Sequence, residues 1–352
     1  MKITKKISNQ NHDIDFLNKT RLKTYLKLNF TKMDIAIIDK KLSNNYLIKY
    51  IYKNFRGRCL FIKGHEKIKS IDNYSKISEK IIKIGIQRKS KIFSIGGGTI
   101  GDLSGFIAST LLRGIDHIMI PTSLLAMVDS SIGGKTGINS KLGKNLIGTF
   151  YLPEKVIVCT DFLKTLPSRE VSCGFAEIIK YAFIDSKKLK KILIRSNDLN
   201  KDLNKIIKIS IETKLKFIKD FMEKSEGKNA RAILNFGHTV GHAIENSNSY
   251  SNRIKHGEAI ALGMIIEYKL SNLLGHNDES IDTLISLLKK YNLPTNFKKF
   301  INSKTITILI KKMMLDKKAS DNYVNLISIK KDHGFINKIS FQNLYKLLNN
   351  IN

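Results

Sequence analysis

With 352 residues, 42% of them hydrophobic, the chain is long enough for two domains with substantial cores, and no run approaches the roughly 20 apolar residues of a membrane span. A formal net charge of +31 ordinarily suggests a nucleic-acid or membrane partner, but the lysines are scattered and no nucleic-acid-binding motif is present, so a compositional bias explains the charge and we expect neither partner. Three cysteines without metal-like spacing, and an N-terminus without an apolar signal segment, argue against a secreted disulfide-bonded protein and predict a cytoplasmic one.

The first half of the chain alternates short β-rich runs with helical stretches. Buried strands are predicted at 33–39, 58–64, 91–98, 117–123 and 155–161. Such runs, separated by helices, indicate a parallel sheet with crossover helices. Beyond Pro167 the strand signal fades, and amphipathic helices are predicted at 169–184, 202–223, 230–245 and 256–274. We therefore expect an α/β protein with a parallel-sheet domain over residues 1–165 and an all-helical domain over residues 166–352.

A glycine-rich turn follows the predicted strand at 91–98. Gly96, Gly98 and Gly101 satisfy the spacing G-x-G-x-x-G, which lets backbone N–H groups and a helix N-terminus approach a pyrophosphate. The same spacing also occurs in tight turns where a helix packs closely on a strand. Asp39 ends an upstream strand, where its carboxylate could bind ribose hydroxyls or cap a helix.

The segment "DSSIGGKTGINSKLGKNLIGTFYLP", residues 129–153, combines glycines and lysines with almost no apolar periodicity. This composition favours a binding loop in which Lys135, Lys141, Lys144 and Asn145 surround a phosphorylated ligand. An ordinary solvated loop is the alternative.

Polar side chains on the later predicted helices suggest a metal site. His238 and His242 share one helix face, and Glu177 and His256 lie on other helices. A catalytic zinc ion takes three nitrogen or oxygen ligands and keeps one open position, so His, His and Glu would suffice. Thr239 stands where a metalloprotease base would be, and histidines that are only structural remain the alternative.

Six stretches together resemble the 3-dehydroquinate synthase family, in order over about residues 34–318: "GGGTIGDLSGFIASTLLRG", "PTSLLAMVDSSIGGKTGIN", "LGKNLIGTFYLP", "LKTLPSREVSCGFAEIIKY", "LNFGHTVGHAIE" and "HGEAIALGM". The resemblance implies a Rossmann-like NAD-binding domain, a helical domain and an active site between them. It also implies conversion of 3-deoxy-D-arabino-heptulosonate 7-phosphate to 3-dehydroquinate and phosphate, with NAD regenerated in each turnover, one zinc or cobalt ion, and a homodimer.

The resemblance assigns roles residue by residue. The implied metal ligands are Glu177, His238 and His256, while His242 faces substrate. The implied NAD-binding residues are Asp39, Glu66, Lys69, Gly97, Gly98, Asp102, Thr122, Ser123, Lys144, Phe162, Leu163, Lys164 and Thr165. The implied catalytic residues are Lys135, Asn145, Arg231, Asn235 and His242, and the implied substrate-binding residues are Arg113, Asp129, Lys180, Lys216 and Lys317. Arg113 is expected to reach the partner subunit's site, and Lys317 is preferred to Lys318.

The sequence departs from the family pattern at a few positions. One extra residue separates Glu226 from Arg231, which blurs the alignment of Lys216, and Ala182 replaces a glycine after the metal glutamate. Ser123 replaces the second of two threonines. Three other functions remain open: a polyol dehydrogenase of the glycerol dehydrogenase type, which would release NADH, a sugar-phosphate cyclase with another substrate, such as a deoxy-inosose synthase, and a basic nucleic-acid-binding protein.

Overall fold

The computed structural model describes all residues except 222–229, 248–253, 277–279, 302, 315–321 and 352. The chain forms two compact units. One contains residues 1–167 and 219–221, and the other contains 168–218 and the described part of 222–352. This division follows Pro167, two residues after the boundary expected at 165.

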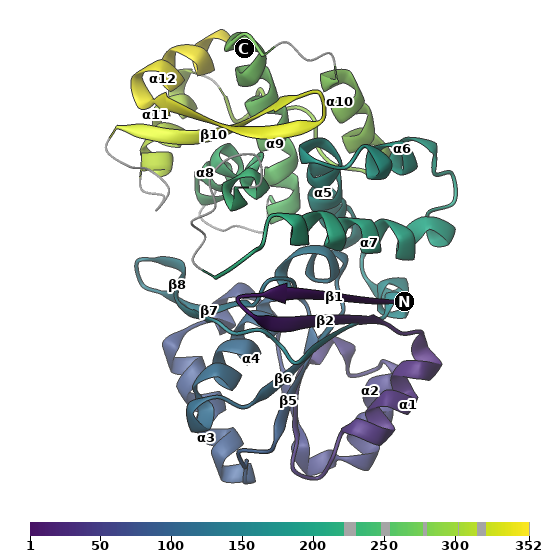
Figure 1. Ribbon diagram of the computed structural model, residues 1–352. Helices are drawn as coiled ribbons and strands as arrows, with labels where there is room; N and C mark the ends of the chain where they lie inside the picture. Colours follow the sequence, from purple (N-terminus) through teal and green to yellow (C-terminus); the bar gives the residue numbers. More distant parts are fainter. Residues whose placement is uncertain (222–229, 248–253, 277–279, 302, 315–321, 352) are drawn as a thin grey trace. The chain divides into compact units, whose positions relative to one another are not determined.

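The first unit is built on a seven-stranded sheet (Figure 1) with the order β1-β2-β9-β6-β5-β3-β4. Its strands are β1 (Lys2–Ile7), β2 (Gln10–Phe16), β3 (Ile35–Asp39), β4 (Cys59–Ile62), β5 (Lys91–Gly96), β6 (Asp116–Pro121) and β9 (Lys155–Val158). Neighbouring strands are parallel except for β1 and β2. The expected α/β fold and its five predicted strands, β3, β4, β5, β6 and β9, are confirmed, whereas the β1–β2 hairpin was not predicted.

Helices cover both faces of this sheet. Figure 1 shows α1 (Lys19–Asn29) and α2 (Tyr46–Asn54) on one face, with α3 (Ile71–Ile84) and α4 (Gly98–Thr110) on the other. Asn18, Asn45 and Ser70 accept backbone N–H groups at the first turns of α1, α2 and α3, as N-cap residues do. The core between the sheet and α4 contains Ile92, Leu103 and Ile107, all fully buried.

The glycine- and lysine-rich segment is a hairpin rather than the expected loop. Its strands are β7 (Lys135–Ser140) and β8 (Gly143–Phe150). Gly137 and Gly148 lie opposite each other, and a side chain on Gly148 would overlap the carbonyl oxygen of Thr136. The glycines therefore allow close strand pairing. Because they have no side chain, they also interrupt the alternation of apolar and polar residues by which a strand is recognised in a sequence.

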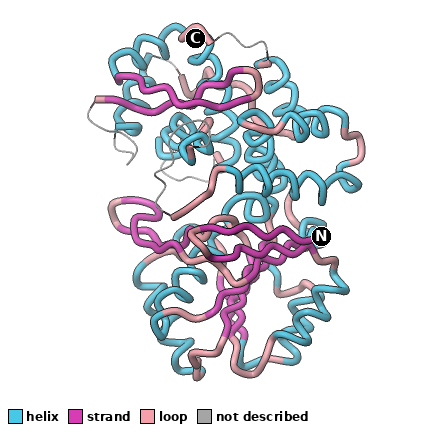
Figure 2. Tube along the Cα trace, viewed as in Figure 1, coloured by secondary structure: helices cyan, strands magenta, loops and turns pink. Residues whose placement is uncertain are grey.

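The second unit is mainly helical, as the helix colour in Figure 2 shows. Its helices are α5 (Ser168–Ile184), α6 (Lys187–Arg195), α7 (Leu199–Lys216), α8 (His238–Ser247), α9 (His256–Leu273), α10 (Ile281–Lys290), α11 (Ser303–Met314) and α12 (Phe341–Asn350). The expectation of an entirely helical domain was wrong, because β10 (Tyr323–Lys330) and β11 (His333–Ser340) form an antiparallel hairpin. Shorter helical turns in the two units are η1 (Lys40–Leu42), η2 (Arg56–Arg58), η3 (Glu66–Ile68), η4 (Leu111–Arg113), η5 (Ala126–Ser130), η6 (Thr160–Thr165) and η8 (Arg231–Asn235). Among the described helices of either unit, none combines the length and apolar character that crossing a bilayer requires.

Candidate metal and cofactor sites

Four predicted site residues meet where α5, α8 and α9 pack together. Glu177 lies on α5, His238 and His242 lie on α8, and His256 is the first residue of α9. Oε1 of Glu177 is 3.3 Å from Nε2 of His238 and 3.6 Å from Nε2 of His256. One nitrogen from each of the three histidines lies within 4.8 Å of the others. His242 therefore adds a fourth donor to the predicted ligand set.

Glycines bring the three helices into close contact. A Cβ atom on Gly257 would lie 2.5 Å from Cα of Cys173 on α5, and one on Gly263 would lie 2.8 Å from the backbone N of Gly241 on α8. No larger residue fits these positions without moving a backbone. The side chains of the candidate metal site are therefore held by helix packing rather than by loops.

The chemistry of these side chains fits a divalent cation. Glu177 is fully buried, its Oε2 forms an ion pair with Lys180, and its Oε1 faces the imidazoles of His238 and His256. Burial opposes ionisation, but Lys180 and His238 hold the pKa of Glu177 well below its ordinary value. Burial and the nearby Lys180 lower the pKa of His238 to about 3, so its imidazole is neutral and can act as a ligand.

The third imidazole is flanked by two carboxylates. Burial lowers the pKa of His256, but hydrogen bonds and charge from Glu177 and Glu245 outweigh burial and raise it to about 10. The position therefore favours positive charge, which a metal ion can supply in place of the proton. Glu245 is a site residue that the sequence reasoning missed, although it follows His242 by three positions on the same helix face.

The glycine turn between β5 and α4 shows the close helix–strand packing that was one of the two alternatives for its sequence. A Cβ atom on Gly96 would lie 2.7 Å from Ile100, and one on Gly101 would lie 2.6 Å from Met119, so these two glycines serve close packing. Gly97 is the N-cap of α4 and has no side chain to block its first turn. The half-buried amide end of this helix can receive an anionic group.

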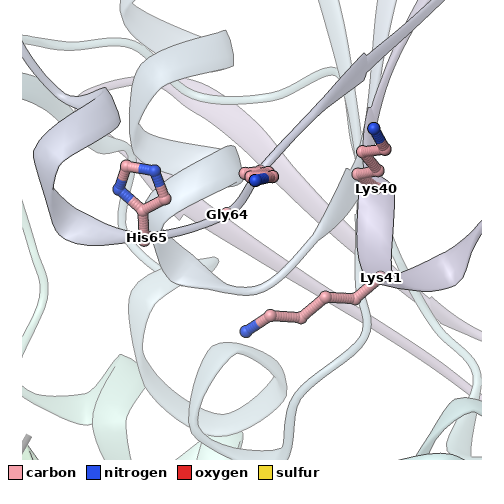
Figure 3. A pocket seen from close by; sticks show the side chains of 5 residues that line it. Lys40, Lys41, Gly64 and His65 are labelled. Carbon is pink, nitrogen blue, oxygen red and sulfur yellow. The ribbon is translucent and has the colours of Figure 1, made fainter.

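A pocket of about 290 Å³ lies at the ends of β3 and β4, next to the turn in which Asp39 binds Gly64. Figure 3 shows four of its lining residues, Lys40, Lys41, Gly64 and His65. The pocket is lined by Lys40, Lys41, Lys63, Gly64 and His65. Oδ1 of Asp39 accepts the N–H groups of Lys41 at 3.1 Å and Gly64 at 3.3 Å. Asp39 therefore serves as a turn cap while it stands at the edge of a pocket in the position expected for a coenzyme ribose.

Three predicted cofactor residues and one predicted catalytic residue form a network around Lys69. This ammonium group is 2% exposed, donates to Oδ2 of Asp102 at 2.7 Å, and lies 3.8 Å from Glu66. It also donates to the side chain of Asn145 in β8. Burial raises the pKa of Asp102 despite the opposing charge of Lys69. The network links the expected cofactor residues to the expected phosphate-binding hairpin.

Comparisons with known proteins show the family to which the chain belongs. The protein-family model described as "3-dehydroquinate synthase N-terminal" matches residues 59–173. The family model described as "3-dehydroquinate synthase C-terminal" matches residues 174–319. A 3-dehydroquinate synthase of Prochlorococcus marinus (strain AS9601) is 40% identical over 317 residues, covering 86% of this chain and 85% of the relative. The chain belongs to the 3-dehydroquinate synthase family.

Solved structures share the fold of this family member. A 2-deoxy-scyllo-inosose synthase superposes with a TM-score of 0.83 at 24% identity, covering 99% of both chains. The 2-epi-5-epi-valiolone synthase ValA of Streptomyces hygroscopicus subsp. jinggangensis 5008 superposes with a TM-score of 0.80 at 20% identity, covering 98% of this chain and 96% of that one. At these identities the likeness concerns the fold alone.

The departures from the family pattern can be located in part. Ala182 is fully buried inside α5, which continues to Ile184, so the replacement does not end the helix near Glu177. Glu226 and the preferred Lys317 lie outside the described residues. Arg231 is buried at the start of η8, and Asn235 ends that turn.

Two lysines of α7 differ in their surroundings. Lys216 is exposed, and its ammonium group donates to Asp185 at 2.8 Å. Lys214 lies on the buried face of the same helix and is 8% exposed. The family alignment pointed to Lys216, whereas burial distinguishes Lys214 as the lysine held inside the second unit.

Other residues of the family pattern are spread over the first unit. The N–H of buried Thr122 donates to Gly96 at 2.9 Å, and the hydroxyl of Ser123 accepts from Ala126 at 3.3 Å. Asp129 lies in η5, and Phe162, Leu163, Lys164 and Thr165 lie in η6, where Lys164 is paired with Asp161. Lys135, Lys141 and Lys144 belong to the hairpin segment. Arg113 is exposed in a left-handed turn with φ of 69°.

Asn139 is a further residue that the sequence reasoning missed. Its side chain donates to Oε1 of Glu66 at 2.9 Å and accepts the N–H of Asn145 at 2.9 Å, while its own N–H donates to the carbonyl of Lys69 at 2.7 Å. It therefore joins η3 to the hairpin. An asparagine in a polar segment carries no sequence signal for such a role.

Proposed function

We propose that the protein converts 3-deoxy-D-arabino-heptulosonate 7-phosphate to 3-dehydroquinate and phosphate, with NAD and one divalent metal ion as cofactors. The observation that carries this proposal is the meeting of Glu177, His238 and His256 in a member of the 3-dehydroquinate synthase family. The solved 2-deoxy-scyllo-inosose synthase is described with carbaglucose-6-phosphate, NAD+ and Co2+, and ValA with NAD+ and Zn2+. These descriptions support the same pair of cofactors here.

The residues that would hold the metal ion are Glu177, His238 and His256. Bound together, NAD and the metal ion would supply reversible oxidation of one alcohol carbon of the substrate. Glu245 would orient His256 by accepting a hydrogen bond from its Nδ1–H group, so that Nε2 can bind the metal ion. His242, one turn after His238, would face substrate and help to move its protons.

The substrate phosphate would be held by the β7–β8 hairpin. Lys135 starts β7 and Asn145 belongs to β8, where Lys69 bonds its side-chain oxygen. Cations and amide donors of this kind would offset the charge of the phosphate as it leaves. A dianionic phosphate can also accept the neighbouring carbon-bound proton, so no strong protein base is required.

The substrate carboxylate requires a cation. Lys180 is 2% exposed and already lies against Glu177, which places it beside the proposed metal site. We prefer Lys214 to Lys216 as a second partner, because Lys214 is buried whereas Lys216 is exposed and paired with Asp185. A buried cation binds a carboxylate more strongly than one screened by water.

We also infer a cytoplasmic homodimer. The hairpin and the adjacent turn expose large apolar side chains, with Leu142 93%, Leu112 40% and Phe150 40% exposed. A second copy could cover them, and Arg113 beside Leu112 would then face the partner. All three cysteines are free, which suits a reducing compartment.

The test is to incubate purified protein with heptulosonate phosphate, NAD and zinc. Phosphate release without net accumulation of NADH is expected, and protein stripped of metal by a chelator and assayed without added zinc should show none. Steady NADH production from a polyol would instead indicate a dehydrogenase, and turnover of only a different sugar phosphate would indicate another cyclase. Binding to random DNA that persists at physiological salt would favour the nucleic-acid alternative.

A further inference from the structure

Glu267 is a buried glutamate on α9 that takes no part in the proposed metal, cofactor or substrate binding. Its side chain is 1% exposed. Oε2 accepts the N–H of Gly237 at 2.9 Å, and Oε1 accepts the N–H of Val240 at 3.2 Å. Both amides lie at the start of α8, so one carboxylate on α9 binds the first turn of the helix that carries His238 and His242.

These two hydrogen bonds have the pattern of a capping box. In an ordinary capping box the side chain of the N-cap residue bonds the N–H three positions on, and the side chain of that residue bonds the N–H of the N-cap. Because α8 begins at His238, Gly237 is the N-cap and Val240 is the third residue of the helix. Neither has a polar side chain, and Glu267 satisfies both amides from another helix.

Packing explains why α8 cannot supply its own cap. Gly237 has a left-handed backbone, with φ of 77°. A Cβ atom there would lie 2.5 Å from Cγ of Met264 and 2.9 Å from the carbonyl oxygen of Ile260. The usual capping residues serine, threonine and aspartate are therefore excluded by α9, the helix that carries Glu267.

We propose that Glu267 is a positioning residue for the metal site, because it fixes the turn of α8 from which His238 faces Glu177 and His256. The inference rests on the proposed metal site. A carboxylate at a helix N-terminus stabilises the amides there through charge-assisted hydrogen bonds. Without it, two amides would lack this acceptor, and the turn that bears His238 would no longer be anchored to α9.

The experiment measures zinc affinity of the full chain by competition with a chromogenic chelator. Glu267→Ala removes both acceptors, whereas Glu267→Gln keeps the size and one acceptor but turns an N–H₂ group toward the second amide. We expect Glu267→Ala to raise the zinc dissociation constant by about tenfold, and Glu267→Gln to raise it by less. Hydrogen exchange of the zinc-free chain should show lost protection at Gly237 and Val240, with α10 and α12 unaffected.

Two matched variants separate positioning from general stability. Ile266→Val changes a fully buried neighbour of Glu267 without touching the cap, and Glu212→Gln removes an exposed carboxylate from α7. Both should bind zinc like the unmodified chain. The proposal is overturned if the Glu267 variants bind zinc within twofold of the unmodified chain, or if their affinity falls only as far as that of Ile266→Val. An unmodified chain that binds no zinc would overturn the metal site itself, an outcome distinct from unchanged affinity in the variants.

Discussion

Oε2 of Glu245 lies 3.1 Å from Nδ1 of His256, on the opposite side of the imidazole from the nitrogen that approaches Glu177. An ionised carboxylate only accepts hydrogen bonds, so Nδ1 keeps its proton, and Nε2 would offer a lone pair to a metal ion once that ion replaces its own proton. Glu245→Gln should therefore weaken zinc binding by about tenfold, because the amide can no longer select this tautomer as strongly. Chelator competition measures the change, with Glu212→Gln as the control. Zinc affinity equal to that of the control would show that Glu245 does not orient the ligand.

Loss of a proposed metal ligand and loss of His242 should have different effects on metal content and turnover. Glu177→Ala and His238→Ala are expected to abolish turnover through loss of metal, because each removes one of the three proposed ligands. His242→Ala should retain stoichiometric metal but turn over at least a hundredfold more slowly, as expected when a proton-transfer group is lost. Metal analysis of dialysed protein, together with phosphate release, distinguishes the two classes. A metal-free His242→Ala variant would make His242 a ligand in place of one of the others.

Lys214 and Lys216 form a matched pair for testing the substrate site. Lys214→Ala should raise KM for the heptulosonate phosphate by roughly 10- to 100-fold, the effect of losing one charged hydrogen bond. Lys216→Ala removes an exposed cation paired with Asp185 and should change KM by less than twofold. Initial rates of phosphate release at saturating NAD measure both. The opposite ranking would restore the assignment that the sequence alignment favoured.

Asn139 bonds both Glu66, an expected cofactor residue, and Asn145 of the hairpin, so its loss should affect substrate binding. Asn139→Ala removes the acceptor for the N–H of Asn145, a residue held in a left-handed backbone with φ of 54°. We expect KM for the sugar phosphate to rise by about tenfold, because Asn145 loses the contact that orients it. Asn54→Ala, which removes one exposed side-chain bond from α2, serves as the control. Kinetics that match the control would mean that the hairpin orients Asn145 without Asn139.

Strands that are buried apolar runs could be predicted from the sequence, whereas strands that depend on pairing with a partner strand could not. β3, β5 and β6 are buried apolar runs and were recognised, whereas β1 exposes most of its residues and contains three lysines. The hairpins β7–β8 and β10–β11 depend on pairing between strands that local periodicity does not report. The α/β fold and its family were therefore predictable, but the strands outside the main sheet core were not.

The same distinction applies to the candidate site. Glu177, His238 and His256 were identified because their motifs match a family, and helix packing then brings them together. Glu245, Asn139 and Glu267 act through contacts with other residues, and nothing in their local sequence marks those partners. Lys214 and Lys216 differ in burial, and this difference depends on how α7 packs in the second unit.

A buried histidine of the first unit predicts how stability depends on pH. His117 is fully buried in β6, its Nε2 lies 2.8 Å from Oγ of Ser94, and burial lowers its pKa to about 3. The unfolded chain binds a proton at this residue near pH 6.5 while the folded chain does not, so stability present above pH 6.5 is lost as the pH falls toward 3. Between pH 7.5 and pH 5 this linkage lowers the free energy of unfolding by about 2 kcal/mol. Urea unfolding at both pH values should show that His117→Gln, which does not titrate, loses about 2 kcal/mol less than the unmodified chain, and equal losses would mean that His117 is protonated in the folded protein.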